Sequence, residues 1–283
     1  MNNHLLVSTE WLEEHLNDPN VRIVDIRGHV IPASEPPPHY FNHEAEFLKN
    51  HIPGAVFIDW VREITDPADP RHAQIAKPDR YAAAMKRAGI NDDTLVVAYD
   101  DAGGMFAARL WWSLNYYGHE QVAVLDGGWA KWIAEGRPVT AYVPNVEPGN
   151  FVAHPNVSLY RSAQQVMESL HTSTVLMDMR SEEEFRGEYA RAERTGHIPG
   201  AINQRRSNLL NPDGTILPVQ QLRDKLGAVG ISESTPDVIV YCNGGVSASF
   251  GLLAMRVAGL KMGGVYDGSW KEWGNDPTRP IEK

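Results

Sequence analysis

The sequence has little of three things, and each shortage excludes a class of protein. It holds a single cysteine in 283 residues, so no disulfide can form within the chain. Lys and Arg number 26 against 36 Asp and Glu, and the net charge of −10 argues against a nucleic-acid or anionic-membrane partner. No apolar run approaches the roughly 18 residues that span a bilayer, and the N-terminus lacks the pattern of a signal peptide. We therefore expect a cytoplasmic protein.

The lone cysteine, Cys242, stands where an open-sheet α/β protein places a nucleophile. It follows the apolar run 238–241, which is typical of a buried parallel strand, and it precedes a helix predicted over 248–259. A helix N-terminus and a tight loop direct backbone N–H groups at the sulfur, which favours a thiolate and binds an anion. An inert core cysteine is the alternative, but the glycine pair favours a reactive one. The predicted anion loop comprises Asn243, Gly244, Gly245, Val246, Ser247 and Ala248.

The chain is a tandem repeat. HIPGA occurs at 51–55 and again at 197–201, and LDGGW at 125–129 corresponds to YDGSW at 266–270. Two predicted strands recur as well, in the segments 21–27 and 174–180, and 95–99 and 237–241. Short β-branched runs alternate with helical stretches, which predicts in each copy a mainly parallel sheet with helices on both faces. We place the first copy at 1–141, a proline-rich linker at 142–156 and the second copy at 157–283.

Residues kept in both copies are expected to serve folding, which both copies need. Asp25 with Arg27, and Asp178 with Arg180, occupy alternate positions of a strand and predict buried ion pairs. The histidines of the HIPGA blocks are expected to be hydrogen-bonded structural residues. The LDGGW and YDGSW blocks are expected to be glycine turns whose tryptophans close a core.

Residues that differ between the copies point to one active site. Asp100 occupies the position of Cys242, and the segment 101–104 corresponds to 243–246. A loop headed by Asp100 and Asp101 is expected to repel an anionic substrate, and it has no sulfur nucleophile. The first copy is therefore predicted to be catalytically silent.

Taken together, these motifs resemble those of the tandem-domain rhodanese-like sulfurtransferases, in the thiosulfate/3-mercaptopyruvate sulfurtransferase group. The resemblance covers nearly the whole chain and implies an inactive rhodanese-like domain at 1–141 and a catalytic one at 157–283. It implies that the Cys242 thiolate takes sulfur from a donor as a persulfide. Cyanide, a small thiol or thioredoxin then accepts that sulfur. No cofactor is expected, and no metal, because the histidines are scattered without ligand spacing.

The residues after the cysteine bear on the choice of donor. Members of the group that prefer thiosulfate tend to have basic side chains there, whereas those that prefer 3-mercaptopyruvate have small neutral ones. Asn243, Gly244 and Gly245 therefore favour 3-mercaptopyruvate, although Gly244 replaces a serine that is frequent in that type. Asp59 and His72 match the spacing of an Asp and a His that face the active site in those enzymes. A polar surface loop is the alternative for both.

A donor carboxylate calls for a guanidinium, which binds it through two hydrogen bonds. The family's substrate arginines fall in the stretch that here holds Arg186, Arg191, Arg194, Arg205 and Arg206. One of them aligns with Glu184, so the pattern is not fully kept. We expect Arg186 and Arg191 to bind the carboxylate, with a solvated charged loop as the alternative.

Two other functions compete with sulfur transfer. Cell-cycle phosphatases share the fold and a cysteine-headed loop, but that loop ends in a phosphate-binding arginine where this chain has Ala248 and Ser249. Phosphoryl transfer is therefore disfavoured. A non-catalytic carrier that holds a persulfide for a protein partner needs the same cysteine, so the sequence leaves that alternative open.

Overall fold

Each half of the sequence builds its own parallel sheet. The computed structural model describes residues 5–31, 35, 36, 38–71 and 73–283. The chain forms two units: unit 1 is Met1–Ala68, Ile75–Asn156 and Asn211–Thr215, and unit 2 is Asp69–Gln74, Val157–Leu210 and Ile216–Lys283. Residues 142–156, predicted as a linker, group with unit 1. The segment 69–74 belongs to unit 2 and the segment 211–215 to unit 1, although the residues on either side of each belong to the other unit. The predicted domains, which have continuous boundaries, do not include this exchange.

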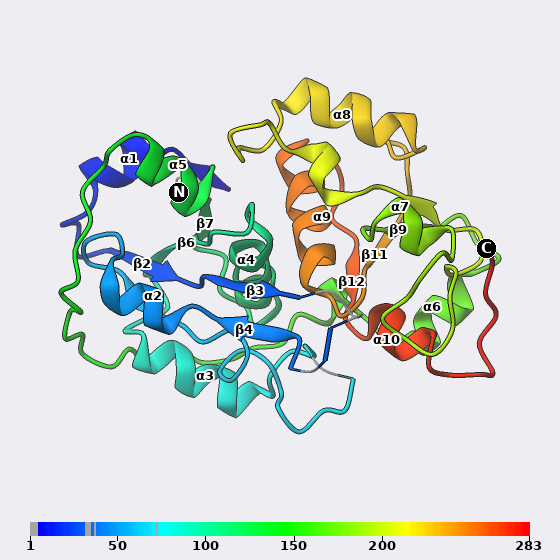
Figure 1. Cartoon of the computed structure of the whole chain (residues 1–283), viewed down its shortest axis with the longest axis horizontal. Helices are drawn as coiled ribbons and strands as arrows, with labels where there is room; N and C mark the ends of the chain where they lie inside the picture. Colours follow the sequence, from blue (N-terminus) through cyan, green and yellow to red (C-terminus); the bar gives the residue numbers. More distant parts are fainter. Residues whose placement is uncertain (1–4, 32–34, 37, 72) are drawn as a thin grey trace. The chain divides into compact units, whose positions relative to one another are not determined.

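Unit 1 is a five-stranded parallel sheet in the order β1-β7-β6-β2-β5, with a separate antiparallel pair, β3-β4 (Figure 1). The strands are β1 Leu6–Val7, β2 Val21–Asp25, β3 Gly28–Val30, β4 Tyr40–Asn42, β5 Val56–Phe57, β6 Leu95–Tyr99 and β7 Val122–Leu125. The helices are α1 Thr9–Glu14, α2 Glu44–Lys49, α3 Pro78–Arg87, α4 Met105–Tyr116 and α5 Gly128–Ala134.

Helices cover both faces of the unit 1 sheet. Alternate strand residues such as Ile23 and Val97 share a buried cluster with Leu12 of α1, Phe47 of α2 and Trp132 of α5. Because successive side chains of a strand point to opposite faces, the intervening residues face the other way, where α4 packs on β6 and β7. This arrangement leaves the carboxyl end of β6, and with it Asp100, beside the N-terminus of α4.

Unit 2 repeats this plan with a five-stranded parallel sheet in the order β10-β9-β11-β12-β8. Its strands are β8 Tyr160–Arg161, β9 Val175–Asp178, β10 Ile202–Asn203, β11 Val238–Tyr241 and β12 Gly264–Tyr266. The helices are α6 Ala163–Ser169, α7 Glu182–Phe185, α8 Val219–Ala228, α9 Val246–Val257 and α10 Ser269–Trp273, with 3₁₀ turns at Val157–Leu159 and Arg206–Leu209.

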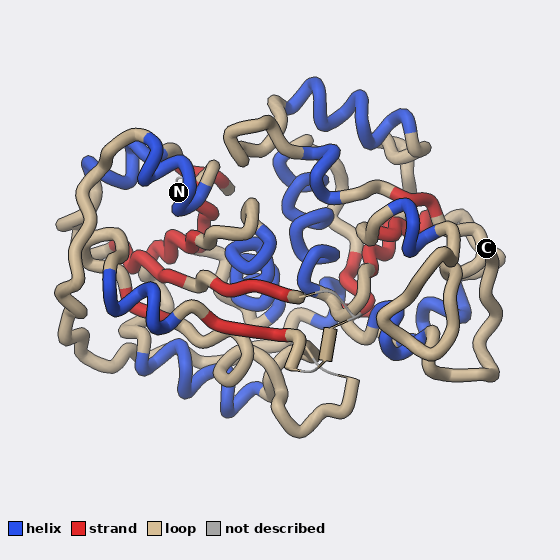
Figure 2. The backbone as a smooth tube through the Cα atoms, viewed as in Figure 1, coloured by secondary structure: helices blue, strands red, loops and turns tan. Residues whose placement is uncertain are grey.

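The unit 2 sheet is also covered on both faces (Figure 2). Ile239 and Tyr241 pack in one cluster with Val166 of α6 and Trp270 of α10, while α9 contacts β11 and β12 on the opposite face. Gly251 lets α9 approach closely, since a Cβ there would lie 2.8 Å from the Met179 sulfur. The predicted fold class, two α/β domains with parallel sheets, is confirmed.

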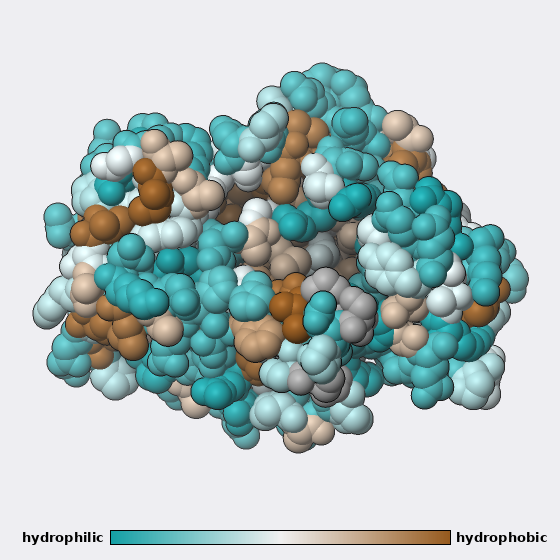
Figure 3. Space-filling view, viewed as in Figure 1, coloured by the Kyte–Doolittle hydropathy of each residue, from teal (hydrophilic) through white to brown (hydrophobic). Residues whose placement is uncertain are grey.

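The residues predicted to serve folding do so in both units. The Arg27–Asp25 and Arg180–Asp178 ion pairs measure 2.8 and 2.6 Å, and all four residues are buried. The two HIPGA histidines each hydrogen-bond a backbone carbonyl through Nδ1 and stack on a phenylalanine ring. Hydrophilic residues cover most of the face seen in Figure 3, with apolar patches between them. Within the described residues, no helix is long and apolar enough to span a membrane.

Candidate active site

Cys242 lies at the carboxyl end of the central strand β11, in the turn that leads into α9. The turn is short, because α9 begins at Val246 with Gly245 as its N-cap. Gly245 adopts a left-handed conformation, with φ of 80°, which glycine accepts without a steric penalty. The Cys242 side chain is largely buried, with 5% of the residue surface exposed. A strand, a tight turn and a helix N-terminus therefore meet at the sulfur, as predicted.

Ser269, the first residue of α10, holds this turn in place. Its Oγ accepts hydrogen bonds from the backbone N–H groups of Cys242 and Gly245, each at 3.1 Å, and donates one to the Tyr266 carbonyl at 2.7 Å. Ser269 has a φ of 53°, a left-handed conformation that costs a residue other than glycine about 1–3 kcal/mol. The three hydrogen bonds, about 1 kcal/mol each, offset that strain. The sequence analysis missed this role because it treated YDGSW as a glycine turn.

The next two residues of α10 extend the same attachment. The Trp270 N–H donates to the Cys242 carbonyl at 2.9 Å, and the Lys271 N–H donates to the Asn243 carbonyl at 3.1 Å. The Asn243 side-chain amide in turn donates to Oε1 of Glu184 at 2.8 Å. Glu184 thus orients the side chain of the first residue after the cysteine.

The corresponding turn of unit 1 is filled by its own first residue. Oδ1 of Asp100 accepts hydrogen bonds from the N–H groups of Ala102 and Gly104 at 2.8 and 2.9 Å. Oδ2 accepts from those of Phe106 and Ala107, in the first turn of α4, at 2.7 and 2.8 Å. The sequence analysis expected this loop to repel anions. The structure shows instead that the Asp100 carboxylate itself binds these backbone N–H groups; that the first copy is catalytically silent stays a prediction.

The two turns align differently from the sequence-based pairing. Three residues separate Asp100 from the N-cap Gly104, whereas two separate Cys242 from the N-cap Gly245. The pairing of 101–104 with 243–246 is therefore wrong by one residue at the helix. In the corrected alignment, Ser247 and Ala248 correspond to Phe106 and Ala107, whose N–H groups bind the carboxylate.

One cation, Lys271, lies beside the Cys242 turn. Lys271 is only 9% exposed, and its pKa is lowered from 10.5 to about 8. Burial is the largest cause, Arg191 acts in the same direction, and Cys242 acts in the opposite direction. Lys271 therefore interacts electrostatically with both Cys242 and Arg191.

The arginines near α7 have different surroundings. Arg186 is 55% exposed and forms ion pairs with Glu188 at 2.9 Å and with Glu182 at 3.6 Å. The Arg194 guanidinium donates to four backbone carbonyls, which ties the C-terminal segment to this loop: those of Trp273, Gly274, Asp276 and Arg279. Arg206 lies over the Phe250 ring. Arg191 is the arginine whose charge acts on Lys271; the roles of Arg191 and Arg186 as donor ligands stay predictions.

Residues 69–74 of the N-terminal half belong to unit 2 and support α10. Arg71 forms ion pairs with Asp69 at 2.6 Å and with Glu272 at 3.0 Å. The side-chain amide of Gln74 donates to the Asp267 carbonyl at 2.9 Å. These contacts flank Ser269 and Lys271 on both sides in sequence. His72, predicted to contribute to the site, lies outside the described residues.

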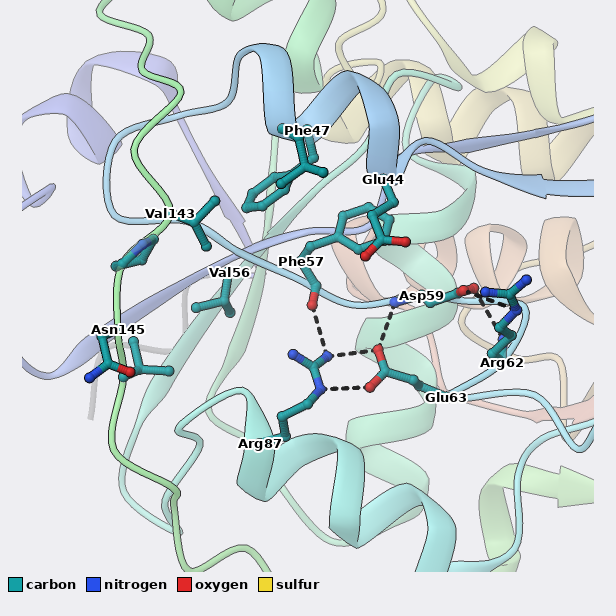
Figure 4. A pocket seen from close by; sticks show the side chains of 13 residues that line it. Glu44, Phe47, Val56, Phe57, Asp59, Arg62, Glu63, Arg87, Val143 and Asn145 are labelled. Carbon is teal, nitrogen blue, oxygen red and sulfur yellow. Dashed lines mark hydrogen bonds and ion pairs between the residues drawn. The ribbon is translucent and has the colours of Figure 1, made fainter.

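Asp59, the other predicted contribution from the first half, lies in unit 1. Its carboxylate accepts hydrogen bonds from the Asn42 side chain at 2.6 Å and from the N–H groups of Val61 and Arg62 at 2.9 and 3.1 Å. It lines a pocket of about 610 Å³ whose other charged residues include the paired Glu63 and Arg87 (Figure 4). The role of Asp59 in catalysis stays a prediction.

Comparison with known proteins identifies the family. The model of the rhodanese-like domain matches twice, at residues 8–135 and 162–276. The chain belongs to the rhodanese family. The sequence-based identification as a tandem-domain rhodanese-like sulfurtransferase is confirmed.

Several relatives of this rhodanese are similar over their whole length. The "Sulfur carrier protein TtuD" of Thermus thermophilus is 35% identical, with 99% of this chain and 96% of that protein covered. The "Probable 3-mercaptopyruvate sulfurtransferase" of Pseudomonas aeruginosa is 34% identical, with 99% of each covered. Among solved structures, SseA from Escherichia coli, a 3-mercaptopyruvate sulfurtransferase by its title, superposes with a TM-score of 0.84 at 31% identity. It covers 94% of this chain and 99% of its own.

Proposed function

We propose that this rhodanese transfers sulfane sulfur through a persulfide on Cys242. The observation that supports this most directly is the Asp100 carboxylate in unit 1. It is bound by the N–H groups of Phe106 and Ala107, which correspond to those of Ser247 and Ala248 beside Cys242. A persulfide carries its negative charge on the outer sulfur, one bond beyond Sγ. In unit 1 the anion at this position is the side chain of Asp100. In unit 2 the reaction itself would produce the anion, as the persulfide of Cys242.

The proposed cycle has two displacements at sulfur. The Cys242 thiolate attacks the sulfur of the donor, so an S–S bond forms and the donor's bond to that sulfur breaks. With 3-mercaptopyruvate the electron pair leaves on carbon, which takes a proton to give pyruvate; with thiosulfate it leaves on sulfite. A nucleophilic acceptor then attacks the outer sulfur and releases the Cys242 thiolate. Cyanide, a small thiol and the thiol of thioredoxin each meet the requirement for an acceptor.

3-Mercaptopyruvate is the donor that we favour over thiosulfate. The loop residues Asn243, Gly244 and Gly245 are neutral, and the charge of Arg191 acts on Lys271, which in turn interacts with Cys242; this supports Arg191 as the ligand of the donor carboxylate. Arg186, which is held by surface carboxylates, stays a second prediction for the same role. Replacing Arg191 by alanine should raise KM for 3-mercaptopyruvate more than for thiosulfate. An equal loss for both donors would assign Arg191 a general or structural role.

The experiment that tests the proposed function combines loading with turnover. Purified protein is incubated with each donor, and intact-mass spectrometry measures whether one sulfur atom adds to Cys242. Steady-state transfer to cyanide is then measured with both donors at matched concentrations. We expect loading and turnover in the native protein and neither in the Cys242→Ser variant. Turnover that persists in this variant would overturn the mechanism.

A second candidate, a carrier that delivers persulfide sulfur to a protein partner, is favoured by one observation. The relative from Thermus thermophilus at 35% identity is named a sulfur carrier protein. A carrier and an enzyme require the same cysteine but differ in turnover. A carrier would load once with the donor and release sulfur to small acceptors slowly, whereas the enzyme cycles. Single loading without cyanide turnover would therefore select the carrier.

A further inference from the structure

The segment after each glycine turn differs between the units at two charged positions, where Ala130 and Lys131 of unit 1 correspond to Lys271 and Glu272 of unit 2. Unit 1 reads DGGWAKW over 126–132 and unit 2 reads DGSWKEW over 267–273. The two tryptophans are shared, and the first of each pair donates its backbone N–H to the carbonyl of Asp100 or Cys242, at 2.8 and 2.9 Å. In this alignment Lys271 corresponds to Ala130. The unit whose loop contains the Asp100 carboxylate thus has an alanine at this position, and the unit whose loop contains Cys242 has a lysine.

The backbone fixes Lys271 against the Cys242 turn. Its N–H donates to the Asn243 carbonyl at 3.1 Å, and the preceding Trp270 N–H donates to the Cys242 carbonyl. These two bonds pair successive residues of α10 with successive residues of the turn. The Trp270 ring is buried in the core of unit 2, which holds this start of the helix in position. The lysine side chain is then enclosed, with 9% of the residue surface exposed.

Burying an ammonium group costs free energy unless an anion compensates for it. Burial and Arg191 both lower the pKa of Lys271, and Cys242 is the group that raises it. The neighbouring sulfur thus favours the charged lysine. An anionic persulfide or an anionic donor at the same place would do so as well. A buried cation beside the cysteine suits a negatively charged substrate.

We propose that Lys271 determines the specificity of this site by attracting anionic sulfur compounds to Cys242 and by stabilising the anionic outer sulfur after transfer. It supplies a positive charge from α10, outside the neutral loop Asn243–Gly244–Gly245. The inference rests on the proposed function in taking Cys242 as the reacting group. The inference adds that a positive charge selects the sulfur donor and that Lys271 supplies this charge.

The test uses a property of the chain that makes it unambiguous, its single cysteine. The second-order rate constants for alkylation of Cys242 by iodoacetate, an anion, and by iodoacetamide, which is neutral, are measured by intact-mass spectrometry near pH 7. Their ratio isolates attraction of the anion, because the thiolate is common to both reactions. Replacing Lys271 by methionine should lower the ratio about tenfold, the equivalent of one pKa unit of charge interaction. Lys271→Arg should keep it.

Two controls make the result specific. Lys225→Met removes one positive charge from exposed helix α8 of the same unit, and it should leave the ratio unchanged. The circular dichroism spectrum and Tm of each variant establish that it is folded, and Lys271→Gln, a neutral polar replacement with the same expected fall, provides the result where the methionine variant is unstable. An unchanged ratio in folded Lys271→Met, or an equal fall in Lys225→Met, would overturn the proposal.

The same variants separate this inference from the proposed function. Alkylation requires no sulfur transfer, so a native protein without turnover still shows whether Lys271 attracts anions. If the protein turns over, Lys271→Met should lower kcat/KM for thiosulfate, a dianion, more than for 3-mercaptopyruvate. A fall that is equal for the two donors, together with an unchanged alkylation ratio, would assign Lys271 a structural role.

Discussion

The turns that follow β6 and β11 have the same backbone plan and opposite chemistry. In unit 1 the turn binds the carboxylate of its own first residue through four backbone N–H groups. In unit 2 the same position holds a thiol, and Ser269 rather than the side chain of residue 242 satisfies the Gly245 N–H. A parallel strand followed by a helix N-terminus forms an anion site. Whether such a site is structural or reactive depends on what occupies it.

The residues that pack against the two turns from outside also differ between the units. Ser269 replaces Gly128, and both have left-handed φ angles, of 53° and 54°. A Cβ on Gly128 would lie 2.5 Å from the Asp100 carbonyl oxygen, so unit 1 excludes a side chain there. Unit 2 accepts one and uses its hydroxyl to hold the turn. The Cys242 turn is thus supported by a residue outside it, and the Asp100 turn by its own first residue.

The largest effect is expected from exchanging the residues that head the two turns. Cys242→Ser should reduce sulfur transfer on the order of 10³-fold or more, since the nucleophile is lost, while Tm stays near that of the native protein. Asp100→Cys in this background should not restore transfer, because unit 1 has Ala130 and Gly128 where unit 2 has Lys271 and Ser269. Steady-state assays measure both. Activity in the double variant would show that the turn alone is sufficient.

The second prediction removes the internal anion. Asp100→Ala should lower the free energy of unfolding by about 2–4 kcal/mol, because buried N–H groups lose an ionised acceptor and the N-terminus of α4 loses a favourable charge. The adjacent Asp101→Ala is the control. Its carboxylate is 23% exposed and pairs with His43 at 2.7 Å, so the expected loss is below about 1 kcal/mol. Urea unfolding followed by tryptophan fluorescence compares them, and equal losses would contradict the occupied-site interpretation.

The third prediction concerns the external support of the reactive turn. Ser269→Ala keeps the strained φ but leaves the buried Cys242 and Gly245 N–H groups without their acceptor, which should cost about 1–3 kcal/mol. Ser269→Gly makes the same loss but relieves the strain, so it should be the more stable variant. Both should lower kcat about tenfold or more, because the sulfur is less well positioned. A Ser269→Ala variant with native kcat would show that α10 holds the turn through Trp270 and Lys271 alone.

Much of this comparison could be predicted from the sequence, because the repeat itself provided an alignment. The strands, the buried ion pairs and the position of Cys242 follow from apolar runs and from motifs that occur in both halves. Lys271 and Ser269 could not be recognised, because they are 29 and 27 positions from Cys242 and reach it only through the pairing of α10 with the turn. The one-residue shift was missed because the two turns were paired without a gap, and only the starts of the helices, at Met105 and Val246, show that the unit 1 turn is one residue longer.

The smallest expected effect, a dependence on pH, follows from the cation that distinguishes the two loops. Burial lowers the Lys271 pKa to about 8, so the side chain is charged below that pH and becomes neutral above it. The ratio of iodoacetate to iodoacetamide alkylation rates should therefore fall several-fold as pH rises through 8, toward the value for Lys271→Met. In Lys271→Arg the ratio should stay constant, because a guanidinium remains charged over this range. A fall of equal size in the arginine variant would mean that another group titrates, and the charge near Cys242 would then have to be assigned elsewhere.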